Sequence, residues 1–247
     1  MFYLIGLGLN EKGYSREAYD AITKCKKIYV DNYTIEFPYE MKNLEKQFPK
    51  EKFILLNREA VEGLEFLGEA RKTDVALLVY GSPLTATTHI TILKEAKTNK
   101  IKTKVIYSAS ILDAIAETGL QIYKFGKITS MPRWDARKNF TPDSFIEVVK
   151  ENQSIDAHSL ILVDIGLSFE SALDELEKTI AKHKIPLTKI IVCQQLGTRG
   201  QKIIFCHPSQ LTEFKNIHPP FCFIIPGKLH FIEKEFLENF KPEQNLY

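Results

Sequence analysis

The sequence has few cysteines, a single tryptophan and no long hydrophobic run. Its four cysteines (Cys25, Cys193, Cys206 and Cys222) are scattered, with no Cys-x-x-Cys pair and no partner at zinc-site spacing. No apolar run approaches the roughly 20 residues that a membrane-spanning helix needs. These absences argue against a disulfide scaffold, a zinc module and a membrane protein. We therefore predict reduced, mostly buried thiols and no metal site.

An excess of charge of either sign is also missing. The 33 Lys and Arg residues nearly balance the 31 Asp and Glu residues, giving a net charge of +2. This balance argues against broad, nonspecific nucleic-acid binding. The first residues lack the basic region and apolar length of a signal peptide. We expect a cytoplasmic protein with no membrane or nucleic-acid partner.

The first 110 residues alternate short apolar runs with amphipathic stretches, a pattern typical of βαβ units and a largely parallel sheet. The expected strands are 2–7, 27–31, 53–56, 74–79 and 104–108, and the expected helices are 15–26, 38–47, 58–71 and 88–99.

This alternation is less regular after residue 110. Two expected strands, 189–194 and 201–205, are separated only by the turn at 197–200, which predicts a hairpin and a mixed sheet. We therefore predict two α/β domains, 1–110 and 111–247, with a ligand site between them. The other expected strands are 120–125, 159–165 and 221–225, and the expected helices are 142–151, 170–183 and 232–240.

Three segments follow expected strands in the first domain, where open α/β sheets bind their ligands. Gly81–His89 offers backbone N–H groups and hydroxyls, although a helix cap explains its threonines equally well. Gly6–Leu9 suggests a dinucleotide loop, with Asp31 as its ribose-binding acid, but Glu11 replaces the third glycine and a simple tight turn fits as well. Ser108–Ile111 suits either a ligand's polar edge or a helix N-cap.

Two strings in the second half carry unusual residue combinations. Gly119–Lys127 alternates aromatic and basic residues, which also suits an edge strand with lysines in solvent. Pro226–His230 ends the last expected strand with a turn, a cation and an imidazole. No Gly-x-Ser-x-Gly element supports a serine hydrolase.

Together these strings resemble the diphthine synthases, a family of tetrapyrrole-methylase-type methyltransferases. They occur in family order from the first strand to the last, so the resemblance covers nearly the whole chain. The most specific strings are Ala86-Thr87-Thr88-His89, Gly119–Lys127 and Pro226–His230.

The resemblance implies two α/β domains, usually in a homodimer, with S-adenosylmethionine in the cleft between them. It implies methylation of the amino group on an aminocarboxypropyl-modified histidine of translation elongation factor 2, giving diphthine. The cofactor-binding residues that it implies are Leu9, Ser82, Thr85, Ser110, Ile111, Val163, Leu196 and His230.

The sequence departs from the family at Ser82, because the family's loop normally reads Gly-Asp-Pro. A serine can still bond to an ammonium or a hydroxyl, but it loses the charge-assisted part of the bond, which is about twice as strong as a neutral one. Weaker cofactor binding, or compensation by Asp31 or Asp113, is the expected consequence.

The catalytic residues stay open. His89, Asp113 and bulk water are all candidate bases, and Tyr33 is a candidate aromatic wall for a quaternary ammonium product. The candidate docking patch for an acidic partner surface consists of Lys124, Lys127, Arg133 and Arg137, and solvated loop charges explain it equally well.

Two other functions remain as alternatives. One is a tetrapyrrole-methylase-type methyltransferase acting on a precorrin or an RNA. The other is a non-catalytic scaffold that binds S-adenosylmethionine, suggested by the departure at Ser82.

Overall fold

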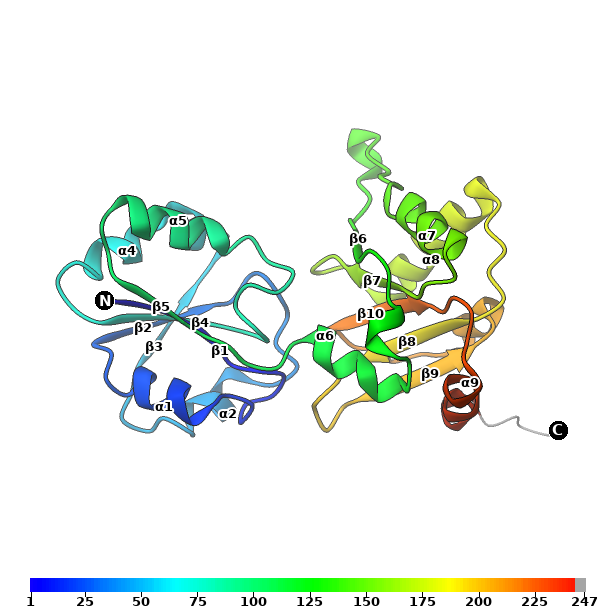
Figure 1. Ribbon diagram of the computed structural model, residues 1–247. Coiled ribbons are helices and arrows are strands. Elements are labelled where there is room, and N and C mark those ends of the chain that lie inside the picture. The colour runs from blue at the N-terminus through cyan, green and yellow to red at the C-terminus, as the bar shows by residue number, and fades with distance from the viewer. Residues whose placement is uncertain (243–247) are drawn as a thin grey trace. The chain divides into compact units, whose positions relative to one another are not determined.

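The computed structural model describes residues 1–242, except for the side chain of Ala136. The chain divides into two compact units, Met1–Ala114 and Ile115–Tyr247 (Figure 1). We call them unit 1 and unit 2 and describe each by itself.

Unit 1 contains a five-stranded sheet in the order β3-β2-β4-β1-β5, in which every pair of neighbouring strands is parallel. The predicted parallel sheet is confirmed. Its strands are β1 (Phe2–Gly6), β2 (Lys27–Asp31), β3 (Phe53–Leu56), β4 (Val75–Val79) and β5 (Thr103–Ile106).

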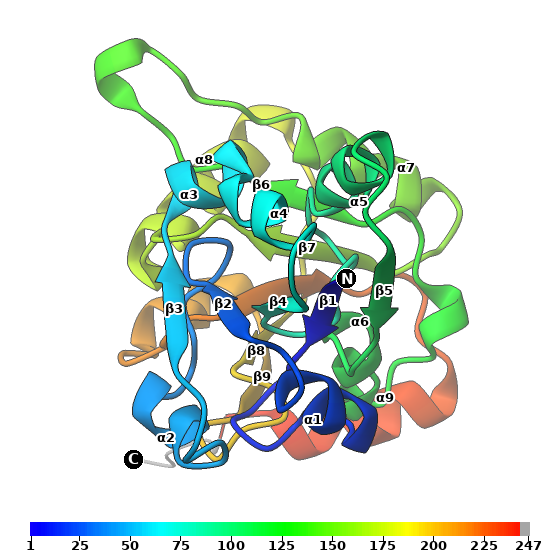
Figure 2. The same ribbon diagram turned by 90° about the vertical axis from the view of Figure 1, so that its left-hand side faces the viewer.

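Helices cover both faces of this sheet, as Figures 1 and 2 show. Alternate strand residues pack in opposite directions, so Leu77 packs against one group of helices and Leu78 against the other. α1 (Arg16–Ile22) and α2 (Met41–Glu45) cover one face, and α3 (Arg58–Gly63), α4 (Glu65–Glu69) and α5 (Ile90–Thr98) cover the other. The single helix expected over 58–71 is wrong, because Leu64 adopts a left-handed conformation (φ 58°) that separates α3 from α4.

Unit 2 contains a second five-stranded sheet, in the order β6-β7-β10-β8-β9. β6 and β7 are parallel and the other neighbouring pairs are antiparallel, including the hairpin β8–β9, so the predicted mixed sheet is confirmed. The strands are β6 (Thr129–Met131), β7 (Ser159–Val163), β8 (Ile190–Gln194), β9 (Lys202–Cys206) and β10 (Phe221–Ile225).

α7 (Phe145–Ser154) and α8 (Phe169–His183) pack their apolar sides on one face of this sheet. All four cysteines are free and buried, as predicted. The remaining helical elements are α6 (Ile111–Ala114), α9 (Phe231–Leu237) and the 3₁₀ turns η1 (Ile115–Thr118), η2 (Ile122–Lys124), η3 (Ala136–Lys138), η4 (Pro208–Glu213) and η5 (Glu238–Phe240).

The strand expected at 120–125 is wrong. This segment forms η2, and only Phe125 makes a bridge, to His158. The side chain of Lys124 bonds to Glu233 instead of facing solvent, as an edge-strand lysine would. The strand β6, which follows a few residues later, was not predicted because its three residues are too short to show a period.

Candidate functional site

The loops that follow β1 and β4 are joined at the carboxyl edge of the parallel sheet. The N–H of Gly8 donates to the carbonyl of Gly81 (3.1 Å), and the N–H of Gly81 donates back to Gly8 (2.9 Å). β1 leads to α1 on one face of the sheet, whereas β4 leads to α5 on the other face (Figure 1). Such a divergence marks the position where open α/β sheets bind ligands.

The glycines of these loops have different roles. A Cβ on Gly6 would lie 2.6 Å from the carbonyl oxygen of Gly81, and one on Gly8 would lie 2.5 Å from that of Gly13. Gly6 therefore allows the two loops to pack on each other, and Gly8 allows the loop after β1 to fold back on itself, which favours the tight-turn interpretation over a dinucleotide loop. Gly81 (φ 71°) differs, because the nearest atom to its added Cβ is the Ala109 carbonyl oxygen at 3.9 Å. This is an ordinary van der Waals distance, so the positive φ, and not a close contact, is the reason for a glycine at this buried position.

Of the residues implied in unit 1, Ser82 and Thr85 offer the free polar groups. Both are half-buried, and neither hydroxyl has a hydrogen-bond partner among the described residues. Leu9 is buried, and its carbonyl accepts a bond from the Tyr80 hydroxyl (3.1 Å). The structure therefore places two unpartnered hydroxyls in the loop that follows Gly81.

Ser110 is already engaged within its own loop. Its N–H and its hydroxyl donate to Oδ2 of Asp113 (2.7 and 2.9 Å), and its hydroxyl accepts from the N–H of Leu112 (3.2 Å). This is the N-cap that the sequence left open as one of two interpretations. Ile111, the next residue, is half-buried at the start of α6.

Asp31 and His89 form a buried pair beneath these loops. Oδ1 of Asp31 accepts bonds from the N–H groups of Tyr33 (3.0 Å) and Thr34 (3.1 Å). Oδ2 accepts from the Thr34 hydroxyl (2.6 Å) and from Nε2 of His89 (2.8 Å). Burial raises the pKa of Asp31, but these bonds outweigh it and lower the pKa below its ordinary value.

The pair cannot serve the roles that the sequence suggested for it. Nδ1 of His89 faces the carbonyl of Pro83 (3.0 Å), which only accepts hydrogen bonds. Nε2 lies against the Asp31 carboxylate, so both ring nitrogens of His89 are engaged in hydrogen bonds. His89 therefore has no free nitrogen for a substrate proton. Asp31, 1% exposed, is closed to a ribose and cannot compensate for Ser82.

The residues implied in unit 2 lie at two different ends of its sheet. Val163 ends β7, and Leu196 follows β8, whose direction is the same. His230 follows β10, which runs antiparallel to both and pairs Ile225 with Ser159 at the start of β7. At roughly 3.4 Å per residue, the length of β7 separates the two ends by about 14 Å. Val163 and Leu196 therefore lie at one end of the strands, and His230 lies toward the other end.

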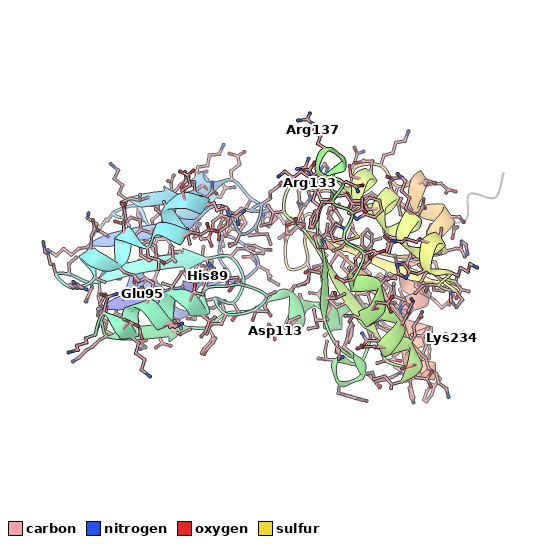
Figure 3. The ribbon with its side chains drawn as sticks, turned by 90° about the horizontal axis from the view of Figure 1, so that it is seen from above. His89, Glu95, Asp113, Arg133, Arg137 and Lys234 are labelled. Atoms are coloured by element: carbon pink, nitrogen blue, oxygen red, sulfur yellow. The ribbon has the colours of Figure 1, made fainter. Side chains whose placement is uncertain are left out.

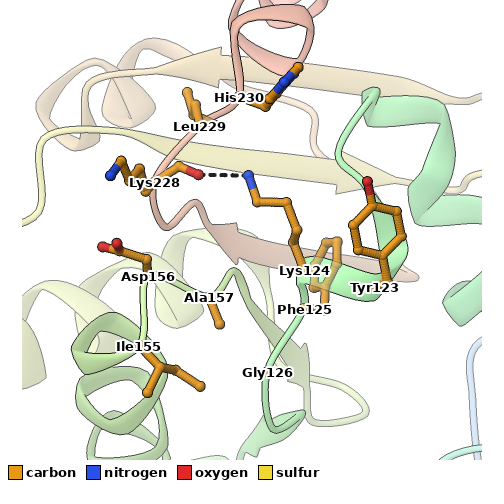
Figure 4. Close-up of a pocket in the computed structure, with 10 residues that line it drawn as sticks. All are labelled: Tyr123, Lys124, Phe125, Gly126, Ile155, Asp156, Ala157, Lys228, Leu229 and His230. Carbon is orange, nitrogen blue, oxygen red and sulfur yellow. Dashed lines mark hydrogen bonds between the residues drawn. The ribbon is translucent and has the colours of Figure 1, made fainter.

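His230 instead borders an open groove of about 470 Å³, in which the two unusual strings of the second half meet (Figure 4). Tyr123, 82% exposed, lies on one side, and the exposed Ile155 lies on another. The lining residues are Tyr123, Lys124, Phe125, Gly126, Ile155, Asp156, Ala157, Lys228, Leu229 and His230.

A buried carboxylate, Glu233, holds the two strings together. Its Oε1 accepts from the N–H of Gln121 (3.0 Å) and from Nε2 of His158 (3.2 Å). Its Oε2 accepts from Nζ of Lys124 (2.6 Å) and from the N–H of His230 (2.7 Å). Burial raises the pKa of Glu233, but the bonds from these four groups outweigh it and lower the pKa to about 2. Glu233 thereby fixes the backbone at both sides of the groove.

Glu233 was not among the residues predicted from the sequence. One signal could have found it, because a polar residue followed three positions later by Glu at a helix start is the spacing of a capping box. The structure shows such a box between His230 and Glu233 at the start of α9.

No group of three or more His, Cys, Asp or Glu residues that could hold a metal occurs within residues 1–242. In the same described range, no helix is long and apolar enough to cross a membrane.

The chain belongs to the tetrapyrrole (corrin/porphyrin) methylase family, whose model matches residues 1–212. Relatives of full length are diphthine enzymes. The diphthine methyl ester synthase of Dictyostelium discoideum is 35% identical, over 99% of this chain and 100% of its own length. The diphthine synthase of Methanococcus aeolicus is 34% identical, over 96% and 97%. A crystal structure of diphthine synthase matches with a TM-score of 0.87 at 27% identity, over 98% of this chain and 96% of the other.

Proposed function

We propose that this chain is an S-adenosylmethionine-dependent methyltransferase of diphthamide biosynthesis. Its substrate is the amino group of the aminocarboxypropyl-modified histidine of translation elongation factor 2. The observation that carries the proposal is the end-to-end similarity to diphthine enzymes of both eukaryotes and archaea. The unpartnered hydroxyls of Ser82 and Thr85, just after the end of β4, agree with it. We further propose that the protein is cytoplasmic and forms a homodimer, in which each subunit consists of two domains, 1–110 and 111–247.

The cofactor-binding residues that we propose come from both units. In unit 1, the free hydroxyls of Ser82 and Thr85 fit a ligand with an ammonium or ribose hydroxyls. The buried apolar Leu196 and the half-buried Val163 suit contacts to a flat ring. The other members of the proposed set are Leu9, Ser110, Ile111 and His230.

When bound, S-adenosylmethionine supplies an activated methyl group, so the chain's own task is positioning. The acceptor amine, with a pKa near the 10.4 that is typical of lysine, must lose its proton before it attacks. His89 is excluded as the base by its two hydrogen bonds, which leaves Asp113 and water. Tyr33, half-buried after β2, remains our candidate wall for the quaternary ammonium product.

The decisive experiment is mass spectrometry of elongation factor 2 carrying the aminocarboxypropyl histidine, after incubation with this protein and the cofactor. We expect successive additions of methyl groups to the modified residue. Three additions give diphthine, whereas one more, on the carboxylate, gives the methyl ester that several relatives are named for. Transfer to precorrin or ribosomal RNA, with none to the elongation factor, would contradict the proposal. Cofactor binding without transfer to any of these would indicate a scaffold.

The departure at Ser82 supplies a separate test of the cofactor site. We expect Ser82→Asp to tighten S-adenosylmethionine binding about tenfold, because a carboxylate adds a charge-assisted bond to the cofactor ammonium. Isothermal calorimetry measures the change. Ser130→Asp, at an exposed position in unit 2, is the matched control and should leave the affinity unchanged. Equal affinities of Ser82→Asp and the unmodified protein would mean that this loop does not contact the ammonium.

A further inference from the structure

The segment 132–142, which connects β6 to α7, projects from unit 2 as a long loop (Figure 2). We call it the basic loop, because it contains three basic residues and one acid. Figure 3 shows Arg133 and Arg137 pointing outward from it. The sequence grouped both arginines with Lys124 and Lys127 in one candidate docking patch.

The structure separates these four basic residues. Lys124 bonds to the buried Glu233, and Lys127 forms an ion pair with Glu151, so both charges are balanced within unit 2. Arg133 and Arg137 are exposed, and neither guanidinium forms an ion pair among the described residues, although the charge of Arg133 partly opposes the burial that raises the pKa of Glu175. The free positive charge of the patch therefore lies on the basic loop alone.

The basic loop is held in shape by its own hydrogen bonds. The N–H of Asp135 donates to the carbonyl of Phe140 (2.8 Å), and the N–H of Phe140 donates back (3.0 Å). The indole Nε1 of Trp134 donates to the carbonyl of Pro142 (3.1 Å). A loop that is already ordered loses less entropy when it binds a partner. Phe140, 52% exposed, adds an apolar side chain that such a partner can cover.

The base of the basic loop lies beside a proposed cofactor residue. The N–H of Arg133 donates to Oδ2 of Asp164 (3.1 Å), the residue directly after Val163. The N–H of Trp134 donates to Oε1 of the buried Glu175 (3.1 Å). Because β6 and β7 are parallel, the loop begins at the edge of the sheet where β7 ends. Two carboxylates thus anchor the loop next to Val163.

We propose that the basic loop docks an acidic segment of the protein that accepts the methyl group. This inference rests on the proposed function, in which the acceptor is one residue of a large protein that must be held from outside the site. A guanidinium binds a carboxylate through two parallel bonds, which fits the two free arginines. Two free arginines and a net charge of +2 supply few of the phosphate contacts that RNA binding needs, so we favour a protein partner.

The test compares three double variants of the full chain. Arg133→Glu/Arg137→Glu should lower kcat/KM for modified elongation factor 2 about tenfold at low salt, mainly through KM, because exposed charges act on encounter. Added salt should shrink this difference. Arg133→Lys/Arg137→Lys should fall between the glutamate variant and the unmodified protein, because lysine keeps the charge and loses the two parallel bonds. The matched control, Lys94→Glu/Lys97→Glu, reverses two exposed charges on α5 and should match the unmodified protein.

The affinity for S-adenosylmethionine, measured by calorimetry, should be the same in all variants, because no variant changes a proposed cofactor residue. An unchanged KM in the glutamate variant, with active unmodified protein, would overturn the docking role alone. Inactive unmodified protein would overturn the proposed function as well. A variant that loses binding to a ribosomal RNA fragment and keeps its KM for the elongation factor would show that the partner is RNA.

Discussion

Each unit contains one buried pair of a histidine and a carboxylate, and the two pairs differ at the second ring nitrogen. In unit 1, Nε2 of His89 lies 2.8 Å from Asp31 and Nδ1 faces the carbonyl of Pro83. In unit 2, Nε2 of His158 lies 3.2 Å from Glu233, whereas Nδ1 accepts a bond from the N–H of Gly227 (2.9 Å). When the group that faces Nδ1 can only accept a hydrogen bond, Nδ1 must carry a proton. When that group donates a hydrogen bond, Nδ1 must be unprotonated. From these bonds we predict an imidazolium at His89 and a neutral ring at His158.

The difference shows how each buried carboxylate is balanced. The positive charge beside Asp31 comes from the imidazole itself. Beside Glu233 it comes from the ammonium of Lys124, and the neutral imidazole contributes only a hydrogen bond. Burial lowers the pKa of His158, in keeping with its neutral form. The histidine of the pair thus has a different charge in each unit. The backbone group that faces its Nδ1 determines that charge.

Of the changes that test this comparison, removal of the Glu233 carboxylate should have the largest effect on the free energy of unfolding. Glu233→Ala leaves a buried imidazole and two N–H groups unpaired and the Lys124 ammonium without its anion. Breaking a buried ion pair typically costs about 3–5 kcal/mol, and we expect a loss of that size in the free energy of unfolding. Urea unfolding measures it. Glu235→Ala, at an exposed position of the same helix, is the control and should change stability by less than about 0.5 kcal/mol.

The loop 226–230 adds a second readout for the same variant. If Glu233 fixes this loop through the N–H of His230, the alanine variant should also show faster amide exchange from Gly227 to His230. Stability and exchange that match those of Glu235→Ala would mean that the carboxylate does not organise the groove.

Protonation of Glu233 should destabilise the protein less than its removal does, and it should appear in the pH dependence of the free energy of unfolding. Since the folded pKa of Glu233 is about 2, below its ordinary 4.5, its contribution is complete above about pH 4.5 and is lost as the pH falls toward 2. The lowered pKa of His158 acts in the same direction, because the unfolded chain binds that proton more readily below about pH 6.5. Unfolding midpoints in urea should fall as the pH is lowered from about 5 to 3.

Glu233→Gln is the variant that isolates the contribution of residue 233. Glutamine cannot ionise, so the part of the acid step that belongs to this residue should disappear. An acid step of unchanged size in this variant would show that other carboxylates cause it.

The sequence predicted the periodic elements of this fold and missed the contacts that depend on distant residues. The strands of unit 1 and the hairpin of unit 2 follow from local apolar runs, so a single sequence reveals them. The segment 120–125 has an alternating pattern that suits a strand, but Glu233, more than a hundred residues later, draws Lys124 inward. Likewise, Asp31 follows the spacing of a ribose-binding acid, and only the fold reveals that His89 occupies it. The loop at Gly81–Ser82 was predictable because strand ends are local signals.

The protonation states of the two histidines offer the most direct test of the comparison and need no change in stability. Nitrogen-15 NMR at neutral pH distinguishes an imidazolium from each neutral tautomer. We expect both nitrogens of His89 to carry protons and His158 to carry one, on Nε2. Asp31→Asn removes the anion that balances the imidazolium, so it should shift the His89 signals toward a neutral ring and leave those of His158 unchanged. A neutral His89 in the unmodified protein would mean that Asp31 holds the proton, and the two pairs would then differ in which partner is protonated rather than in their charge.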